Sequence, residues 1–240
     1  MSSVKQLDLG GLLLEVSDEK IYCVADLHLC VSRPHEIIDF ANEVADCSGS
    51  YSLLLILGDL FDVYVGPEDL RAPEFAALFT AFDEFSSTGR VIVIRGNRDV
   101  LLSPQHAAKY SFDVSDVVIA NQLSQRTLYL HGDVFCSADL KYQRLRKLLR
   151  CRPTRLLLRL LPVFVRRKLG RRMRQVSTAE VARKEMGEMQ LDFPAIAAAA
   201  SRFKASNVVV GHLHKAQTEQ ITANCRLEVL SAWHPRLTSR

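Results

Sequence analysis

Five short segments of the chain carry side chains that bind divalent metal ions. They are Asp26-Leu27-His28, Gly58-Asp59-Leu60-Phe61-Asp62, Gly96-Asn97-Arg98-Asp99, His131-Gly132-Asp133 and Gly211-His212-Leu213-His214. Together they offer carboxylate, amide and imidazole groups but no cysteine or lysine, a set that suits manganese, iron, zinc or magnesium. One such segment would carry little information, but five in a single chain predict a metal centre.

Each segment follows, at once or after one residue, a short apolar run that is typical of a buried β-strand. The runs are rich in branched residues and cover Ile21–Ala25, Leu53–Leu57, Val91–Ile94, Thr127–Leu130 and Val208–Val210. Their hydrophobicity is continuous rather than alternating, which indicates strands covered on both faces. Helical stretches at Pro34–Cys47 and Ala72–Ser86 are long enough for right-handed crossovers between the first three strands. Since ligands in open α/β sheets gather at the carboxyl ends of strands, we expect the five segments to meet.

The rest of the pattern predicts one α/β domain covering residues 1–240. Two further strands are expected near Val117–Ile119 and Arg226–Leu230, and an alanine-rich helix around Ile196–Phe203. Residues 1–19 depart from this pattern, because the stretch Leu7–Val16 has two glycines between apolar runs. This arrangement predicts an extra N-terminal β-hairpin.

Two metal ions about 3.5–4 Å apart would activate water and neutralise the oxygens of a phosphate ester or anhydride, with a carboxylate bridging them. Asp59 is the candidate bridge, because Gly58 allows the backbone to turn tightly at the end of a strand. Asn97 and His131 would complete the second of the two sites.

Two pairs of ligands share the same spacing. Asp26 and His28 alternate along a segment that is expected to be extended, so both side chains would point the same way. His212 and His214 repeat this spacing, so each could serve a different metal ion.

The remaining polar residues of the five segments have two interpretations each. A lone aspartate after a strand is often a helix N-cap. Asp62, Asp99 and Asp133 are instead interpreted as carboxylates that orient the imidazoles, since a metal-bound histidine usually donates its other N–H to such a group. Arg98 offers a bidentate clamp for a phosphate oxygen, and the alternative is a structural ion pair with Asp99 or Asp133.

The net charge of +4 hides a strong asymmetry along the chain. Residues 141–184 hold 16 of the 31 basic residues and a single acidic residue, Glu180, for a charge of +15, while the remainder carries −11. Such a distribution predicts a basic face that meets an anionic surface, either a membrane or a nucleic acid. Few stacking aromatic residues accompany these charges, which argues against single-stranded nucleic acid.

The basic residues lie in an insertion covering residues 138–190. Leucines at helical spacing alternate with basic residues from Leu145 onward, and Pro153 and Pro162 divide the stretch. This pattern predicts two or three short amphipathic helices.

The location of the protein is also suggested by the sequence. The six cysteines show no CxxC spacing, which indicates reduced thiols. No signal peptide and no uncharged apolar run of about 18 residues is evident. We therefore expect a cytoplasmic protein.

The order of the motifs, DxH, GDxxD, GNxD, HGD and GHxH, resembles that of the calcineurin-like metallophosphoesterases. The resemblance implies a sandwich of two mixed β-sheets flanked by helices, with the insertion as a helical cap. It also implies two divalent ions, expected to be Mn²⁺, and catalytic roles for Asn97, Arg98 and His131. The implied ligands are Asp26, His28, Asp59 and His214 for one ion, and Asp59, Asn97, His131 and His212 for the other.

Most of that family has histidine where this chain has Arg98. The arginine and the insertion resemble the branch of the family that hydrolyses UDP-2,3-diacylglucosamine in lipid A biosynthesis. This implies release of UMP and 2,3-diacylglucosamine 1-phosphate at the cytoplasmic face of the inner membrane, with no nucleic-acid and no obligate protein partner. The implied substrate contacts are Arg98, Asp139, Tyr142, Arg174, Ser177, Lys184 and His212.

Three alternatives stay open. The stretch Val181-Ala182-Arg183 replaces polar residues of the relatives, which favours a related phosphodiesterase acting on another lipid- or nucleotide-linked phosphate. A nuclease would use the basic insertion on nucleic-acid phosphates. A non-catalytic lipid-binding relative is the third alternative, and the complete set of seven ligands argues against it.

Overall fold

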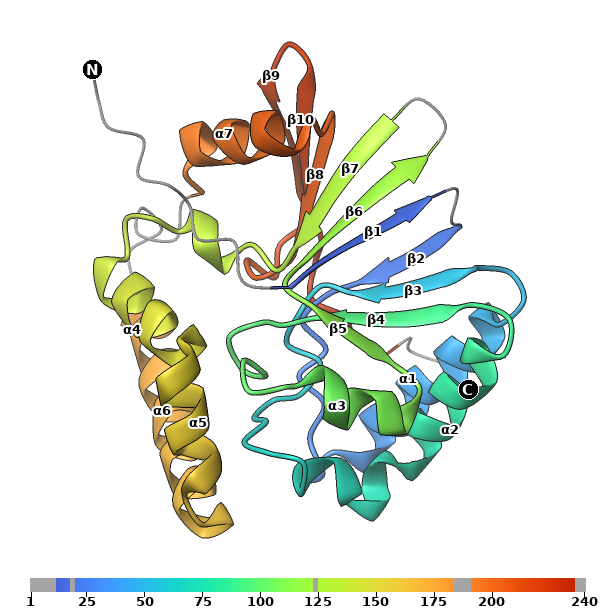
Figure 1. The fold of residues 1–240 in the computed structure, drawn as a ribbon, viewed down its shortest axis with the longest axis vertical. Coiled ribbons are helices and arrows are strands. Elements are labelled where there is room, and N and C mark those ends of the chain that lie inside the picture. The colour runs from blue at the N-terminus through green and yellow to red at the C-terminus, as the bar shows by residue number, and fades with distance from the viewer. Residues whose placement is uncertain (1–11, 18–19, 123–124, 184–190, 236–240) are drawn as a thin grey trace.

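Two β-sheets form the centre of the molecule. The computed structural model describes residues 12–17, 20–122, 125–183 and 191–235. The six-stranded sheet holds, in spatial order, β1 (Leu13–Ser17), β6 (Val117–Gln122), β7 (Gln125–Leu130), β8 (Asn207–Val210), β10 (Cys225–Val229) and β9 (Gln217–Thr222). The four-stranded sheet holds β2 (Ile21–Val24), β3 (Leu53–Ile56), β4 (Arg90–Ile94) and β5 (Asp113–Ser115). The two sheets spread from a common region at the centre of Figure 1.

Most neighbouring strands run parallel, as the continuous apolar runs predict. All pairs of the four-stranded sheet are parallel, and Leu53 of β3 lies opposite both Ile21 and Arg90. In the other sheet β7 and β8 are parallel, whereas β6–β7 and β10–β9 are antiparallel. The residues of β3 are fully buried, which confirms a strand covered on both faces.

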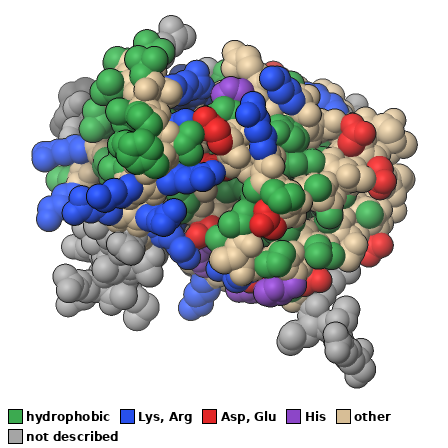
Figure 2. Space-filling model, turned by 90° about the horizontal axis from the view of Figure 1, so that it is seen from below, with side chains coloured by type: hydrophobic (Ala, Val, Ile, Leu, Met, Phe, Trp, Pro, Cys, Tyr) green, Lys and Arg blue, Asp and Glu red, His purple; other side chains and the backbone are tan. Residues whose placement is uncertain are grey.

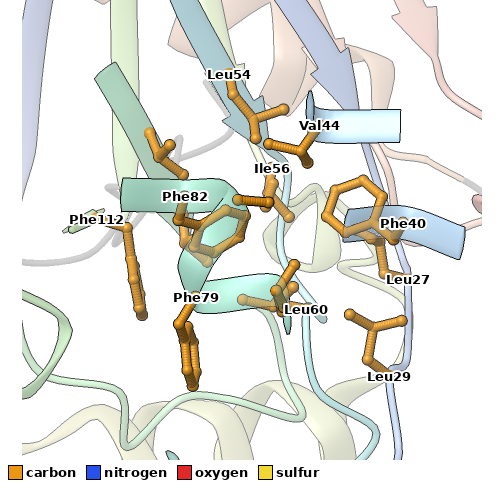
Figure 3. Packing of buried hydrophobic residues seen from close by; sticks show 14 of the residues in the cluster. Leu27, Leu29, Phe40, Val44, Leu54, Ile56, Leu60, Phe79, Phe82 and Phe112 are labelled. Atoms are coloured by element: carbon orange, nitrogen blue, oxygen red, sulfur yellow. The ribbon is translucent and has the colours of Figure 1, made fainter. Parts of the chain in front are cut away.

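Helices α1 (Pro34–Cys47) and α2 (Ala76–Ser86) cover the outer face of the four-stranded sheet. Ile37, Phe40 and Val44 of α1 are fully buried because their spacing places them on one side of the helix. Figure 3 shows Phe40 and Val44 beside Leu54 and Ile56 of β3, with the phenylalanines of α2 completing the cluster. The first helix has the predicted bounds. The second begins four residues later than predicted, since two short 3₁₀ turns precede it (Asp69–Arg71 and Pro73–Phe75).

Helix α7 (Phe193–Phe203) covers the outer face of the six-stranded sheet through Ile196, Ala199 and Ala200. A separate apolar cluster that includes Leu55 and Val118 joins the two sheets face to face. The layers therefore follow the order helix, sheet, sheet, helix, which confirms the predicted α/β sandwich, although only the six-stranded sheet is mixed as expected. The other short elements are α3 (Pro104–Ala107) and the 3₁₀ turns Ala108–Tyr110 and Asp133–Phe135.

Three helices stand beside the sandwich (Figure 1) and form what we call the cap, namely α4 (Leu140–Arg150), α5 (Arg152–Leu160) and α6 (Val163–Arg183). Pro153 lies in the first turn of α5, and Pro162 lies between α5 and α6. The prediction of short helices fails only for α6, which extends over 21 residues.

The first described strand, β1, lies at an edge of the six-stranded sheet and pairs in parallel with β6. The first arm of the predicted N-terminal hairpin lies outside the described residues. Within the described part of the chain, no helix has the length and apolar character needed to cross a membrane.

Candidate metal centre

Unusual backbone conformation marks the predicted ligands. Asp26, His28, Asp59, His212 and His214 all have positive φ, between 51° and 70°. Residues other than glycine rarely adopt this region, and such strain clusters at functional sites. The extended geometry expected for the Asp26/His28 and His212/His214 pairs is therefore wrong. Each pair follows the end of its strand, and its residues have left-handed backbone conformations.

The first group of ligand atoms comes from Asp26, His28 and His214, all within 4.8 Å of one another. Nε2 of His214 lies 3.3 Å from Nε2 of His28 and 3.6 Å from Oδ1 of Asp26. Oδ2 of Asp59 lies 3.9 Å from Nδ1 of His28. These four residues are the set that the sequence assigned to one ion.

The second group comes from Asp26, Asp59 and His131. Nε2 of His131 lies 3.8 Å from Oδ1 of Asp59 and 3.1 Å from Oδ1 of Asn97. The two oxygens of Asp59 therefore face different groups, as a bridging carboxylate requires. Asp26 also belongs to both groups, which the sequence did not predict.

The donor atoms fit divalent cations. Nδ1 of His131 lies 2.8 Å from the carbonyl oxygen of Leu57 and must donate to it, so Nε2 presents a lone pair toward Oδ1 of Asn97. Within the described part of the chain, Oδ1 of Asp26 and Nδ1 of His28 are buried without a hydrogen-bond partner. Buried groups of this kind cost free energy unless something binds them, and a cation satisfies all of them at once.

Burial also prepares two of the imidazoles to bind cations, whereas for His131 burial is outweighed by the carboxylates of Asp59 and Asp26, which raise its pKa. Burial lowers the pKa of His28 to about 3 and that of His212 to about 4, so both rings are neutral at neutral pH. Burial raises the pKa of Asp59 to about 7, although His131 opposes the effect. A divalent ion reverses this penalty, because its charge favours the ionised carboxylate.

Arg98 lies at the edge of the metal centre with two buried nitrogens, Nε and Nη1, that have no hydrogen-bond partner among the described residues. Its alternative role as an ion-pair partner of Asp99 or Asp133 is wrong. Asp99 accepts hydrogen bonds from the backbone N–H groups of Gly96 (2.6 Å) and Leu60 (3.0 Å). Asp133 pairs with residues of the cap. Arg98 therefore lines the cavity without an ion pair to either carboxylate.

A cavity of about 650 Å³ extends from the metal centre to the cap. At one end it is lined by the polar groups of His28, Asp59, Asn97, Arg98 and His212. The rest of its wall is mainly apolar and comes from the loop after β3, the segment after β4 and all three cap helices. Its aliphatic and methionine lining residues are Val63, Val65, Val100, Leu101, Leu145, Leu149, Leu158, Leu169, Met173 and Leu213. Charged side chains of the cap, among them Lys141, Arg166 and Arg172, line it as well.

The structure explains part of the charge asymmetry in a way that sequence reasoning missed. Five arginines of the cap pair with acidic residues of the sandwich, and three of them, Arg146, Arg150 and Arg166, are largely buried in doing so. The pairs are Arg146–Asp133 (2.9 Å), Arg150–Asp116 (2.8 Å), Arg166–Glu68 (2.9 Å), Arg167–Asp69 (3.1 Å) and Arg174–Asp62 (3.0 Å). The sequence did contain a signal for these pairs, namely the positive charge of the insertion and the negative charge of the remainder. Two segments of opposite net charge within one chain can pair with each other across an internal interface.

These pairs also correct the role expected for Asp62, Asp99 and Asp133. Each accepts hydrogen bonds or an ion pair from groups other than a ligand imidazole, either the cap arginines or backbone N–H groups. His131 is oriented instead by a backbone carbonyl, that of Leu57. The carboxylates hold the surroundings of the centre in place.

Of the residues of the cap that are expected to contact substrate, three line the cavity and the side chains of two are not among those described. Asp139 and Tyr142 line the cavity, and Asp139 caps α4 by accepting a hydrogen bond from the Tyr142 backbone N–H (3.0 Å). Arg174 lines the cavity as well and pairs with Asp62. Ser177 belongs to α6, but its side chain is not among those described, and Lys184 lies outside the described residues.

Comparison with known proteins agrees with this arrangement. The chain belongs to the calcineurin-like phosphoesterase family, whose model matches residues 19–216. Within that family, it is similar to a protein of Sodalis glossinidius (strain morsitans) named UDP-2,3-diacylglucosamine hydrolase. The two are 32% identical over 213 residues, which cover 88% of this chain and 89% of that protein. The protein of the same name from Escherichia coli O139:H28 is 30% identical over 216 residues, covering 88% of this chain and 90% of the relative.

Solved structures match less closely. A predicted phosphoesterase of Streptococcus pneumoniae TIGR4 aligns at 13% identity with a TM-score of 0.41, covering 92% of this chain and 76% of that one. The family model and the curated relatives confirm the predicted family and fold, and they identify a hydrolase of phosphate esters or anhydrides that depends on divalent metal ions.

Proposed function

We propose that this protein hydrolyses the pyrophosphate bond of UDP-2,3-diacylglucosamine, with water adding to one phosphorus as the bridging P–O bond breaks. The products are UMP and 2,3-diacylglucosamine 1-phosphate. The observation that carries the proposal is the single cavity that joins the polar metal centre and Arg98 to an apolar chamber under the cap. A diphosphate attached to acyl chains has this same division into a charged and an apolar part. The names of the relatives support the same substrate.

Two divalent ions, in this proposal Mn²⁺, are held at the centre. Asp26, His28, Asp59 and His214 hold one, and Asp59, Asn97, His131 and His212 hold the other, with Asp59 between them. When bound, such ions activate a water molecule and neutralise charge on the phosphate oxygens. The protein keeps His131 in the required tautomer through the Leu57 carbonyl.

Arg98 binds a non-bridging oxygen of the diphosphate. Its two unpartnered nitrogens are already desolvated, so a hydrogen bond to an anionic oxygen costs little further dehydration. Such preorganised donors stabilise the charge that develops in the transition state. The backbone N–H of Arg98 donates to Oδ1 of Asp59 (2.9 Å), which fixes the arginine relative to the carboxylate that bridges the two ions in this proposal.

The substrate test compares three compounds in the presence of Mn²⁺. UDP-2,3-diacylglucosamine should release UMP rapidly, whereas UDP-N-acetylglucosamine, which lacks the long acyl chains, should react slowly. Bis(p-nitrophenyl) phosphate reports general diesterase activity. Fast turnover of the diester without UMP release from the diacylated compound would overturn the proposal. Repeating the assay with Mg²⁺, Zn²⁺ and Fe²⁺ tests the choice of Mn²⁺.

The cap also supports attachment to a membrane surface. Leu156, Leu157, Leu160 and Phe164 at the junction of α5 and α6 are between 61% and 74% exposed. Figure 2 shows hydrophobic side chains gathered on the cap with Lys and Arg side chains beside them. Apolar side chains would enter the lipid, while the basic residues that have no acidic partner would contribute about 1 kcal/mol each at an anionic surface.

Vesicle flotation tests this attachment. The double variant Leu160→Ser/Phe164→Ser should lose binding to vesicles that contain phosphatidylglycerol. Ile38→Ser is the matched control, because Ile38 is 49% exposed on α1, which packs on the sheet away from the cap. Equal flotation of the double variant and the native protein would contradict attachment through this junction.

A further inference from the structure

The imidazole of His212 is held by rings rather than by hydrogen bonds. In the described part of the structure neither of its ring nitrogens has a hydrogen-bond partner, although its backbone N–H donates to Oδ2 of Asp26 (2.7 Å). The ring of His131 lies edge-on at 4.9 Å, and the ring of Tyr142 lies nearly parallel at 6.2 Å with an angle of 25°. Both separations are within the range of favourable ring contacts.

Tyr142 belongs to the cap, and Asp133 fixes its position. The Tyr142 hydroxyl donates to Oδ2 of Asp133 at 2.7 Å, and Nε of Arg146 donates to the same oxygen at 2.9 Å. Asp133 is 2% exposed, and its backbone carbonyl accepts a further hydrogen bond from Gln143 (2.8 Å). Two residues one turn apart on α4, Tyr142 and Arg146, therefore converge on one buried carboxylate.

Asp133 also stands only two residues after His131 in the chain. Gly132 between them has φ of 107°, and a Cβ atom there would lie 2.9 Å from Cβ of Val210 in β8. The backbone that carries Asp133 is thus packed tightly against the strand that leads to His212. The carboxylate has little freedom to move relative to either histidine.

We infer that Asp133 is a positioning residue, which through the Tyr142 hydroxyl holds the phenol ring against His212 and so ties the cap to the metal centre. The inference rests on the proposed role of His212 as a metal ligand. A metal-bound histidine is usually oriented by a hydrogen bond from its second nitrogen. In this structure the ring of His212 is oriented instead by packing against the ring of Tyr142, which belongs to the cap helix α4.

The hydrogen bond between the Tyr142 hydroxyl and Asp133 also defines the role of Tyr142. Because its hydroxyl is bonded to Asp133, the tyrosine acts on the reaction mainly through its ring and not as a hydrogen-bond donor to substrate. Loss of the hydroxyl should loosen the ring, and loss of the ring should free the imidazole. Both changes are therefore expected to weaken metal binding, and loss of the ring should weaken it more than loss of the hydroxyl.

The test uses the full chain and the variants Tyr142→Phe, Tyr142→Leu and Asp133→Asn. The first readout is Mn²⁺ affinity by titration calorimetry, and the second is the visible spectrum of the Co²⁺-loaded protein, which reports the ligand geometry. Tyr142→Leu should weaken Mn²⁺ binding by about 10-fold, as is typical of groups that orient metal ligands. Tyr142→Phe and Asp133→Asn should give smaller losses with similar changes in the Co²⁺ spectrum.

Tyr110→Phe is the matched control, because Tyr110 is half-buried in the aromatic cluster of α2, against Phe79, and its ring lines no part of the cavity. It should leave Mn²⁺ affinity and the spectrum unchanged. Kinetics add a further distinction, since a positioning role predicts that kcat falls more than KM rises. Melting curves identify any variant that fails to fold, and Tyr142→Phe, which removes one oxygen, keeps the test informative if Asp133→Asn is unstable.

The outcomes separate the inference from the proposed function. Native protein that binds no Mn²⁺ and releases no UMP would overturn the proposed function. Native protein that does both, with all three variants matching it in affinity, spectrum and kcat, would overturn the positioning role alone. A large effect of Tyr142→Leu with none for Tyr142→Phe and Asp133→Asn would also contradict it, because the anchor through Asp133 would then be irrelevant.

Discussion

The carbonyl oxygen of Leu57 accepts a hydrogen bond from Nδ1 of His131 at 2.8 Å, although 74 residues separate the two in the chain. The bond fixes the imidazole tautomer, so that Nε2 faces the centre beside Asn97 (3.1 Å). Leu57 directly precedes Gly58 and Asp59. One turn at the end of β3 therefore supplies both a carboxylate and the group that orients the histidine.

Gly58 is the residue on which this turn depends. Its φ is +89°, and a Cβ atom there would lie 2.5 Å from Nδ1 of His131 and 2.9 Å from Cα of Gly96. Gly58→Ala should therefore displace His131 and lower the free energy of unfolding by about 2–4 kcal/mol, the sum of the left-handed backbone and the overlap. In a chain of this size each kcal/mol lowers the melting temperature by about 2–4 °C.

Gly49→Ala separates the two contributions to that loss. Gly49 also has positive φ (+75°), but no atom lies within 4 Å of the position of a Cβ. This variant should show only the backbone cost of about 1–2 kcal/mol and full Mn²⁺ binding. Gly58→Ala should bind Mn²⁺ more weakly, and equal metal affinity in the two variants would contradict the role of the Leu57–His131 contact.

Arg98→Ala should lower kcat for UMP release by about 10²–10³-fold, the effect typical of losing one preorganised donor. Nε and Nη1 of the side chain are buried without a hydrogen-bond partner among the described residues, so its removal breaks no hydrogen bond of these two atoms. Melting temperature and Mn²⁺ affinity should therefore stay close to native values. Arg98→Lys should recover only part of the rate, because an ammonium cannot form the bidentate contact. A fully active Arg98→Ala would exclude the phosphate clamp.

Metal removal should destabilise the protein as well as inactivate it. At a Mn²⁺ concentration 100 times the dissociation constant, binding stabilises the folded state by about 2.7 kcal/mol. Chelation should lower the melting temperature accordingly, and added Mn²⁺ should restore it. Asn97→Ala and His131→Ala should nearly abolish activity and reduce this metal-dependent shift. Identical melting curves with and without chelator would contradict the assigned ligands.

Much of the fold could be predicted because its signals are local. Continuous apolar runs such as 53–57 mark buried parallel strands, and the spacing of Ile37, Phe40 and Val44 gives the bounds of α1. The ligand side chains follow from the same signals, since residues after parallel strands meet at one edge. The left-handed backbone of Asp26 and Asp59 could not be predicted, because residue type alone favours ordinary φ there.

The cap shows what the sequence leaves undetermined. Its excess of arginine predicts an anionic partner, but not whether that partner is a membrane or the protein itself. The structure pairs Arg146 and Arg150 with Asp133 and Asp116, contacts that depend on how the cap packs against the sandwich. Such long-range pairings have no local signal, and the same holds for the packing of Tyr142 on His212.

The buried pairs of the cap predict a loss of stability in acid. Burial alone would raise the pKa of Asp133, but Arg146 and Arg150 outweigh it and hold the pKa well below its usual range. A depressed pKa in the folded state contributes stability above the unfolded value of about 3.9. That contribution is lost as the pH falls below about 4, toward the folded value.

Asp133→Asn isolates this contribution. It should cost about 3 kcal/mol at pH 7, as expected for breaking a buried ion pair, and the difference from the native protein should shrink between about pH 5 and pH 2. Urea unfolding at a series of pH values measures it. Asp113→Asn is the control, because its pair with Arg90 is exposed and worth under about 1 kcal/mol. A difference that stays constant down to pH 2 would contradict the assignment.

The N-terminal segment is expected to stabilise the sandwich rather than the site. Val16 of β1 is 5% exposed in the cluster between the sheets, and the carbonyl of Leu12 accepts hydrogen bonds from the backbone N–H groups of Asp116 (2.9 Å) and Val117 (3.2 Å). Deleting residues 1–17 should therefore lower the melting temperature by several degrees, since about 2–4 °C is lost per kcal/mol. The point variant Val16→Ala should reproduce part of that loss through the cavity it creates. Mn²⁺ affinity should stay unchanged in both variants, because no described residue of this segment contributes to the ligand groups. An unaltered melting curve for the deletion would show that β1 is dispensable, and a loss of metal binding would show that it supports the centre directly.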